Sequence, residues 1–97
     1  MSTCRFTAEL WRWEARDGWF FVTVPPQESA VIRERPRPPR GFGSVRVRAT
    51  IGSTTWSTSV FPDSTRGAYV LPVKQAVRRA EDLQEGDDAL VLLEVLE

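Results

Sequence analysis

Apolar residues at every second position are the feature that most restricts how this chain can fold. The clearest run places them at Val45, Val47, Ala49 and Ile51. Arg46 and Arg48 lie between them, and this alternation predicts a strand with one face in the core and the other in solvent. With 97 residues, the chain has the size of one domain. We therefore expect a single, mainly β domain over residues 1–97.

Turn residues divide the rest of the chain into further strands. These are expected over residues 3–13, 19–24, 54–61 and 68–71, and a last strand has Val91, Leu93 and Val95 inward. In the first strand the apolar positions change parity after Leu10, because Trp11 and Trp13 follow it. A change of parity predicts a bulge or a strand that changes faces.

Prolines that follow two of the expected strands predict two short helices, because proline suits the first helical position. One helix is expected from Pro25-Pro26 and the other from Pro72. The apolar side of the first helix is expected to comprise Ala30, Val31 and Ile32.

Both halves of the sequence follow the order strand, proline, short helix, loop, strand. Shifting one half onto the other aligns Val24, Pro26, Ala30, Val31 and Arg33 with Val70, Pro72, Ala76, Val77 and Arg79. Helices that start with proline are common, so chance agreement is the alternative. A unit this short cannot bury its own apolar face, whereas two packed units can. We therefore expect an internal pseudo-repeat.

Composition excludes several classes of function. Lysine plus arginine equals aspartate plus glutamate, 13 each, so no net charge draws the chain to nucleic acid or to an anionic membrane. The chain has no histidine and a single cysteine, Cys4, which excludes a catalytic Ser-His-Asp arrangement, an internal disulfide and a thiolate metal cluster. Neither a signal-peptide pattern nor a membrane span is visible, so we expect a cytoplasmic protein.

Several segments resemble a known family. In the second half they are V-R-V-R-A-T-I-G-S-T-T-W-S-T-S-V-F-P (45–62), Y-V-L-P-V-K-Q-A-V-R-R-A (69–80) and L-Q-E-G-D-D-A (83–89). In the first half they are F-T-A-E-L (6–10) and W-F-F-V-T-V-P (19–25). Together they resemble the bacterial domain-of-unknown-function family nineteen-oh-five over nearly the whole chain.

The resemblance implies a small double-split β-barrel, related to the swapped-hairpin domains of AbrB and MazE. Those proteins contribute one L-P…R…G-D unit per chain and build the barrel from two chains, whereas the pseudo-repeat would let this chain hold both halves. The first half departs from the pattern, since an Arg- and Pro-rich loop replaces the Gly-Asp after its helix. The resemblance implies no particular activity; family members are sometimes joined to a YdeI/OmpD-associated domain.

The strand that is rich in Ser and Thr is the best candidate for a binding site. Its hydroxyls at Thr55, Ser57 and Ser59 are candidates to line a groove beside Trp56, together with the helical pair Lys74 and Arg78 as a grip for an anion. The alternative is a solvated sheet face with Trp56 in the core, and a solvated helix face. We expect a non-enzymatic binding module for a small anionic or polar ligand or a protein partner, with no cofactor, as a monomer or weak dimer.

Nucleic-acid binding is the alternative function, by analogy with the AbrB-like barrels. It would use the arginines of the loop and of the following strand: Arg35, Arg37, Arg40, Arg46 and Arg48. A polar loop with no such role is the competing account of the first three. Asp87 and Asp88 are a minimal cation site, but a solvated turn explains them better, and no metal is expected.

Overall fold

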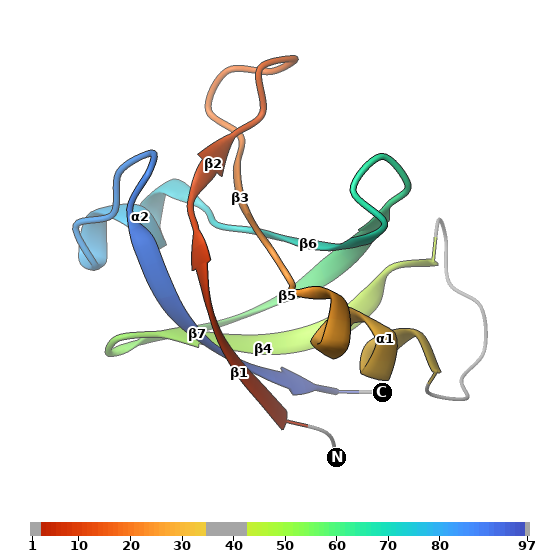
Figure 1. Cartoon of the computed structure of the whole chain (residues 1–97). Helices are drawn as coiled ribbons and strands as arrows, with labels where there is room; N and C mark the ends of the chain where they lie inside the picture. Colours follow the sequence, from red (N-terminus) through yellow and green to blue (C-terminus); the bar gives the residue numbers. More distant parts are fainter. Residues whose placement is uncertain (1–2, 35–42, 97) are drawn as a thin grey trace.

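The computed structural model describes residues 3–34 and 43–96. Within them the chain forms seven strands and two short helices (Figure 1). In chain order they are β1 (Thr3–Glu9), β2 (Trp11–Arg12), β3 (Phe20–Thr23), α1 (Pro26–Glu34), β4 (Val45–Ile51), β5 (Thr54–Asp63), β6 (Ala68–Pro72), α2 (Gln75–Ala80) and β7 (Asp88–Val95). The expected class, mainly β with two short helices, is confirmed.

All seven described strands belong to one antiparallel sheet, in the order β1-β7-β4-β5-β6-β3-β2. Its first and last strands, β1 and β2, follow each other in the chain with only Leu10 between them. The chain thus joins the two ends of the sheet, which curls strongly into a half-barrel (Figure 1).

The expected change of face in the first strand occurs at Leu10. Up to Glu9 the chain pairs with β7, and from Trp11 it pairs with β3. Leu10 itself is fully buried, and its N–H and carbonyl bond to Asp87 and Gly86 at 2.8 Å each. The parity of the tryptophans therefore marks the point where one long strand passes from one part of the curled sheet to another.

Strand β5 is bent in a similar way and is longer than expected. Its residues up to Val60 pair with β4, and Phe61 to Asp63 pair with β6. The sequence predicted that this strand ends at residue 61, but Pro62 still lies within it, opposite Tyr69. Proline fits here because β4 no longer pairs with β5 beyond Val60, so a ladder bond on that side is not required.

The first helix starts as predicted, but the second does not. Helix α1 begins at Pro26 and buries Ile32, whereas Val31, expected on its apolar side, is exposed. Pro72 ends β6 opposite Phe21, and α2 begins only at Gln75. The reason is that the N–H of Val73 still donates to Phe20 O at 2.9 Å, which keeps the chain extended. The alignment of Pro26 with Pro72 is therefore wrong.

The core lies inside the curl of the sheet. The predicted inward residues of β4 and β7 are all buried there: Val45, Val47, Ala49, Ile51, Val91, Leu93 and Val95. Trp56 of β5 belongs to the same cluster. Neither described helix is long and apolar enough to cross a bilayer.

Candidate functional site

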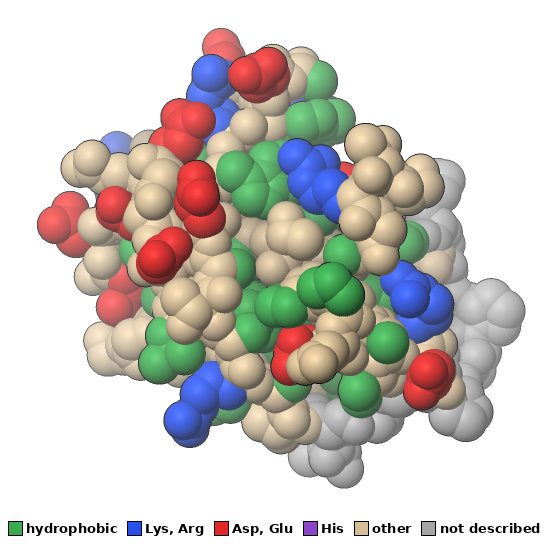
Figure 2. Space-filling model, in the orientation of Figure 1, with side chains coloured by type: hydrophobic (Ala, Val, Ile, Leu, Met, Phe, Trp, Pro, Cys, Tyr) green, Lys and Arg blue, Asp and Glu red, His purple; other side chains and the backbone are tan. Residues whose placement is uncertain are grey.

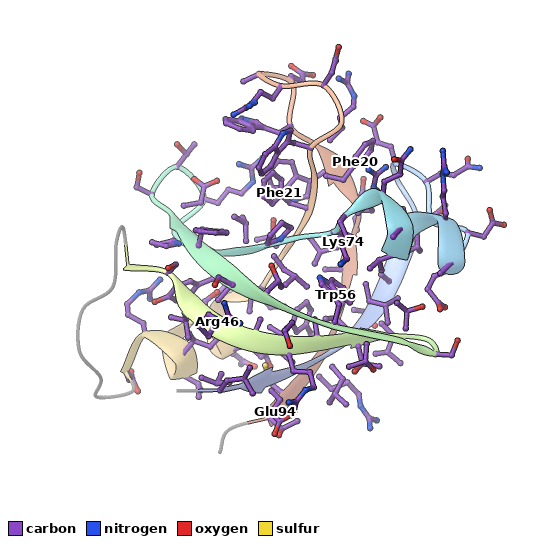
Figure 3. All side chains as sticks on the ribbon, turned by 180° about the vertical axis from the view of Figure 1, so that it is seen from behind. Phe20, Phe21, Arg46, Trp56, Lys74 and Glu94 are labelled. Atoms are coloured by element: carbon purple, nitrogen blue, oxygen red, sulfur yellow. The ribbon has the colours of Figure 1, made fainter. Side chains whose placement is uncertain are left out.

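A groove of about 600 Å³ opens between the β2–β3 hairpin, β5 and the start of α2. Aromatic rings form much of its wall: Trp19, Phe20, Trp56 and Phe61. Lys74 and Arg78 also line it, and no Asp or Glu is among its described lining residues. In Figure 3, the labelled residues Phe20, Lys74 and Trp56 lie one below another on this side of the molecule. The groove thus combines apolar walls with two positive charges.

Arg78 is held in place by neutral groups. Its Nε donates to Val73 O at 3.1 Å and one Nη to Gly18 O at 3.5 Å, while the guanidinium lies over the Phe20 ring, 4.0 Å from the centroid. Partial burial and, secondarily, the neighbouring Arg79 lower its pKa, but a guanidinium keeps its charge in the neutral range. The charge is therefore fixed in position without a carboxylate.

Lys74 lies one helical turn before Arg78, whose N–H donates to Lys74 O at 3.1 Å. Residues with this spacing share one side of a helix. Within the described part of the chain, neither Lys74 nor Arg78 has an acidic partner within 4 Å. The described lining of this largely apolar groove thus carries two cations without an acidic partner.

The structure brings four of the six expected site residues together and leaves two outside. Trp56 and Ser57 line the groove with Lys74 and Arg78. Thr55 and Ser59 are not among the residues that line it, although they share their strand parity with Ser57. The Thr55 hydroxyl lies 3.0 Å from that of Thr50 on β4, and Ser59 lies opposite Arg46 in the β4–β5 ladder.

Sequence reasoning missed the aromatic part of the groove. Phe20 and Trp19 come from the hairpin, and Phe61 comes from the end of β5. The W-F-F run at residues 19–21 was a visible signal, but a strand that is apolar on both faces does not reveal which ring faces the core. The register of β3 against β6 decides this.

A matching set of main-chain contacts occurs at the start of α1. There Val24 N–H donates to Tyr69 O at 2.9 Å, just as Val73 N–H donates to Phe20 O. The side chain five residues after Val24 is Ser29, whose hydroxyl donates to Val24 O at 2.9 Å and accepts from Tyr69 N–H at 3.0 Å. Val24 thus corresponds to Val73, and Ser29 to Arg78.

The two corresponding positions have different surroundings. Ser29 is completely buried, and its short side chain joins two main-chain groups. Arg78 bonds to the equivalent carbonyl but extends over the Phe20 ring into the groove. The end of the sheet at α1 is closed by a hydroxyl, and the end at α2 is open beside a guanidinium.

A second groove, of about 970 Å³, shares Trp19 and Phe61 with the first. Trp11 and Trp13 line it, with Arg66 over the Trp11 ring at 3.7 Å. In contrast to the first groove it contains acidic residues, and Asp63 pairs with Arg66 at 2.9 Å. Arg66, unlike Lys74 and Arg78 in the first groove, thus has an acidic partner among the described residues.

The acidic residues near the end of the chain gather on one side. Figure 2 shows red side chains on the left of the view, over α2 and the start of β7. This part of the sequence contains Glu81, Asp82, Glu85, Asp87 and Asp88. The described residues include no cluster of three metal-ligating side chains, and Asp87 accepts from the N–H of Gln84 at 2.8 Å within the turn.

The arginines of the alternative function are only partly described. Arg35, Arg37 and Arg40 lie outside the described residues. Arg46 and Arg48 are exposed on the outer face of β4, and Arg48 pairs with Glu94 at 2.6 Å (Figure 3 labels Arg46 and Glu94). The charge of Arg48 is thus already compensated.

Cys4 points toward the core side of β1 and is half-buried. Burial, and to a smaller extent the charge of Glu28, raise the pKa of its thiol. A raised pKa keeps the thiol protonated and unreactive at neutral pH. Cys4 is therefore not a candidate nucleophile.

The family model of a domain of unknown function, DUF1905, matches residues 6–93. This is nearly the whole chain, so the chain belongs to the DUF1905 family, and the predicted resemblance is confirmed. No curated protein matches the chain. The description of the family states no activity, so any function has to be argued from the groove itself.

Proposed function

We propose that this DUF1905 domain is a non-enzymatic binding module that takes a small anionic ligand with a flat apolar part in the groove beside α2. The observation that supports this most is the pair Lys74 and Arg78, which line an aromatic groove with no acidic residue among its described lining. Charge-assisted hydrogen bonds from such cations are about twice as strong as neutral ones. An anion is therefore the complement of this site.

The fixed position of Arg78 supports binding rather than mere solubility. Its guanidinium is held by two carbonyls and the Phe20 ring before any ligand arrives. A preorganised side chain loses less conformational entropy when it binds. The rings of Trp19 and Phe61 offer exposed apolar surface for the flat part of the ligand.

We further propose that the half-barrel is a double-split barrel of the AbrB and MazE kind, built from a pseudo-repeat within one chain. Two observations support this. The bent pair β1–β2 contacts β7 and β3, and the bent strand β5 contacts β4 and β6. The pairing scheme stays the same when β1–β2, β3 and β4 of the first half are exchanged with β5, β6 and β7 of the second half. The open groove beside α2, where α1 has a buried serine instead, would then be a departure from the symmetry of the fold.

The binding proposal is tested by titrating the domain with benzoate, phenyl phosphate and inorganic phosphate, followed by tryptophan fluorescence and by calorimetry. Replacing Lys74 and Arg78 together by Gln should weaken binding of the two aromatic anions by at least about a hundredfold, since each of the two charge-assisted bonds contributes about 1.5–3 kcal/mol and about 1.4 kcal/mol corresponds to a factor of ten.

The matched control replaces Arg33 and Arg46 by Gln, which removes the same charge from exposed residues outside the groove. This variant should bind as the wild type does. Equal binding by both variants would contradict the proposal. Binding confined to a short oligonucleotide, steeply weakened by salt and lost in the control variant, would favour the nucleic-acid alternative instead.

A further inference from the structure

Phe20 and Tyr69 are corresponding residues, because each accepts a hydrogen bond from the valine that precedes a helix, Val73 and Val24 respectively. The main-chain N–H groups of Phe20 and Tyr69 should therefore point in corresponding directions. In a hydrogen-bonded pair of an antiparallel ladder, the N–H and the carbonyl of one residue point toward the same partner. Phe20 O accepts from Val73 N–H, so Phe20 N–H also points toward Val73. Tyr69 O accepts from Val24 N–H, and Tyr69 N–H points toward Val24.

Ser29 completes this arrangement at α1. Its hydroxyl stands between the two main-chain groups, accepting from Tyr69 N–H at 3.0 Å and donating to Val24 O at 2.9 Å. A hydroxyl can do both because it carries a donor and acceptor lone pairs. Both polar groups of this buried pair are thereby satisfied.

Arg78 can provide only half of the same bridge. Its Nε donates to Val73 O at 3.1 Å, as the Ser29 hydroxyl donates to Val24 O. A guanidinium has five donors and no acceptor, so it cannot accept from Phe20 N–H. Phe20 lines the groove, so an acceptor that enters the groove can reach this residue.

We infer that an oxygen of the bound ligand accepts a hydrogen bond from Phe20 N–H, in the position that the Ser29 hydroxyl holds in the other half. This rests on the proposed function and narrows the ligand to an oxyanion, that is, a carboxylate or a phosphate ester. Such a group has several acceptor oxygens, which can bond to Phe20 N–H and to the cations Arg78 and Lys74 at once. A monatomic anion such as chloride has a single acceptor atom, so all its donors must converge on one point and it cannot span groups at separate positions in the groove.

The direct test observes the Phe20 amide by ¹⁵N NMR and hydrogen exchange in the full chain. On addition of benzoate or phenyl phosphate, the Phe20 amide proton should move downfield and exchange at least about tenfold more slowly, while the Tyr69 amide stays unchanged. Sodium chloride at the same ionic strength should move neither. A larger effect from phenyl phosphate than from benzoate would identify the phosphate ester as the ligand class, and the reverse would identify the carboxylate.

The variant Arg78→Ser tests the same inference without a ligand. It copies the arrangement that Ser29 already makes in this fold, so the chain should remain folded. Its hydroxyl should take the Phe20 N–H, so that this amide is protected from exchange before any anion is added, and benzoate and phenyl phosphate should no longer bind. The variant Ser29→Ala is the counterpart, and there the Tyr69 amide should exchange faster.

The outcomes separate the inference from the proposed function. If the anions bind, and binding depends on Lys74 and Arg78, but the Phe20 amide neither moves nor becomes protected, the inference is overturned and the proposed function stands. If no anion binds, both are overturned. Should Arg78→Ser fail to fold, the wild-type amide measurement still decides between these results.

Discussion

The starts of α1 and α2 have corresponding main-chain contacts and opposite surroundings. At α1 the chain places Ser29, which is buried and joins two main-chain groups. At α2 it places Arg78, which reaches across Phe20 beside an open groove. The difference lies in the side chain rather than in the path of the main chain. A fold can thus keep one end as a packed support and leave the other available for a ligand, which is how function is added to a scaffold.

The largest loss of stability is expected at a residue that lines the groove beside α2 and also belongs to the core. Trp56 lines the groove, yet only 9% of it is exposed. Trp56→Ala should lower the free energy of unfolding by about 3–5 kcal/mol, because it leaves a large cavity. Urea denaturation followed by circular dichroism measures this. In the matched control, Trp13→Ala, the residue is 42% exposed and the loss should be about 1 kcal/mol. Equal losses would mean that Trp56 belongs to the groove and not to the core.

The next largest loss of stability is expected where the turn between β4 and β5 meets the end of α2. Gly52 has φ +60, and a Cβ there would meet a carboxylate oxygen of Glu81, the group that accepts from the Thr54 hydroxyl at 2.6 Å. Gly52→Ala should cost about 2–4 kcal/mol, since it adds backbone strain and displaces this bond. Gly67→Ala has a similar φ, +66, with free space around it, and should cost about 1–2 kcal/mol. Thermal unfolding of the two variants compares them, and a smaller loss for Gly52→Ala would contradict the role of Glu81.

The smallest losses of stability are expected for Ser29 and Arg78, the side chains at corresponding positions of α1 and α2. Ser29→Ala should cost about 1–3 kcal/mol, because it leaves the Tyr69 N–H and the Val24 carbonyl buried without their partner. Arg78→Ala should cost about 1 kcal/mol, since water can enter the groove and replace the lost bond. Urea titrations of both variants test this difference. If Arg78→Ala proved the more destabilising, Arg78 would be a structural residue and the open end would not be specialised for binding.

Comparing expectation with structure shows which kinds of signal were reliable. The alternation along β4 and β7 located the core residues, because period two is a local property of a strand. The parity change at Trp11 correctly located the bend in the first strand. The start of α2 was wrong, because a bond from Val73 to Phe20, far away in the sequence, keeps the chain extended past Pro72.

The candidate site was predicted by residue type and only in part by position. Lys74 and Arg78 have helical spacing, which is visible in the sequence, and the structure places both in one groove. Thr55 and Ser59 were predicted to line the groove with Ser57, but only Ser57 does so: the Thr55 hydroxyl lies 3.0 Å from that of Thr50, and Ser59 lies opposite Arg46 of β4. The rings of Phe20 and Phe61 were missed, since they come from segments about forty residues apart that meet only through β6.

The sequence by itself determined the class of the fold, the family, the inward residues of the strands and the absence of histidine and disulfide chemistry. These follow from local patterning, from the sequence segments that resemble the family and from composition. Only the tertiary structure decided that Ser29 and Arg78 occupy corresponding positions, and that one end of the sheet is closed while the other is open. The physical reason is that this correspondence depends on the pairing of β3 with β6, a long-range register that short-range patterns do not specify.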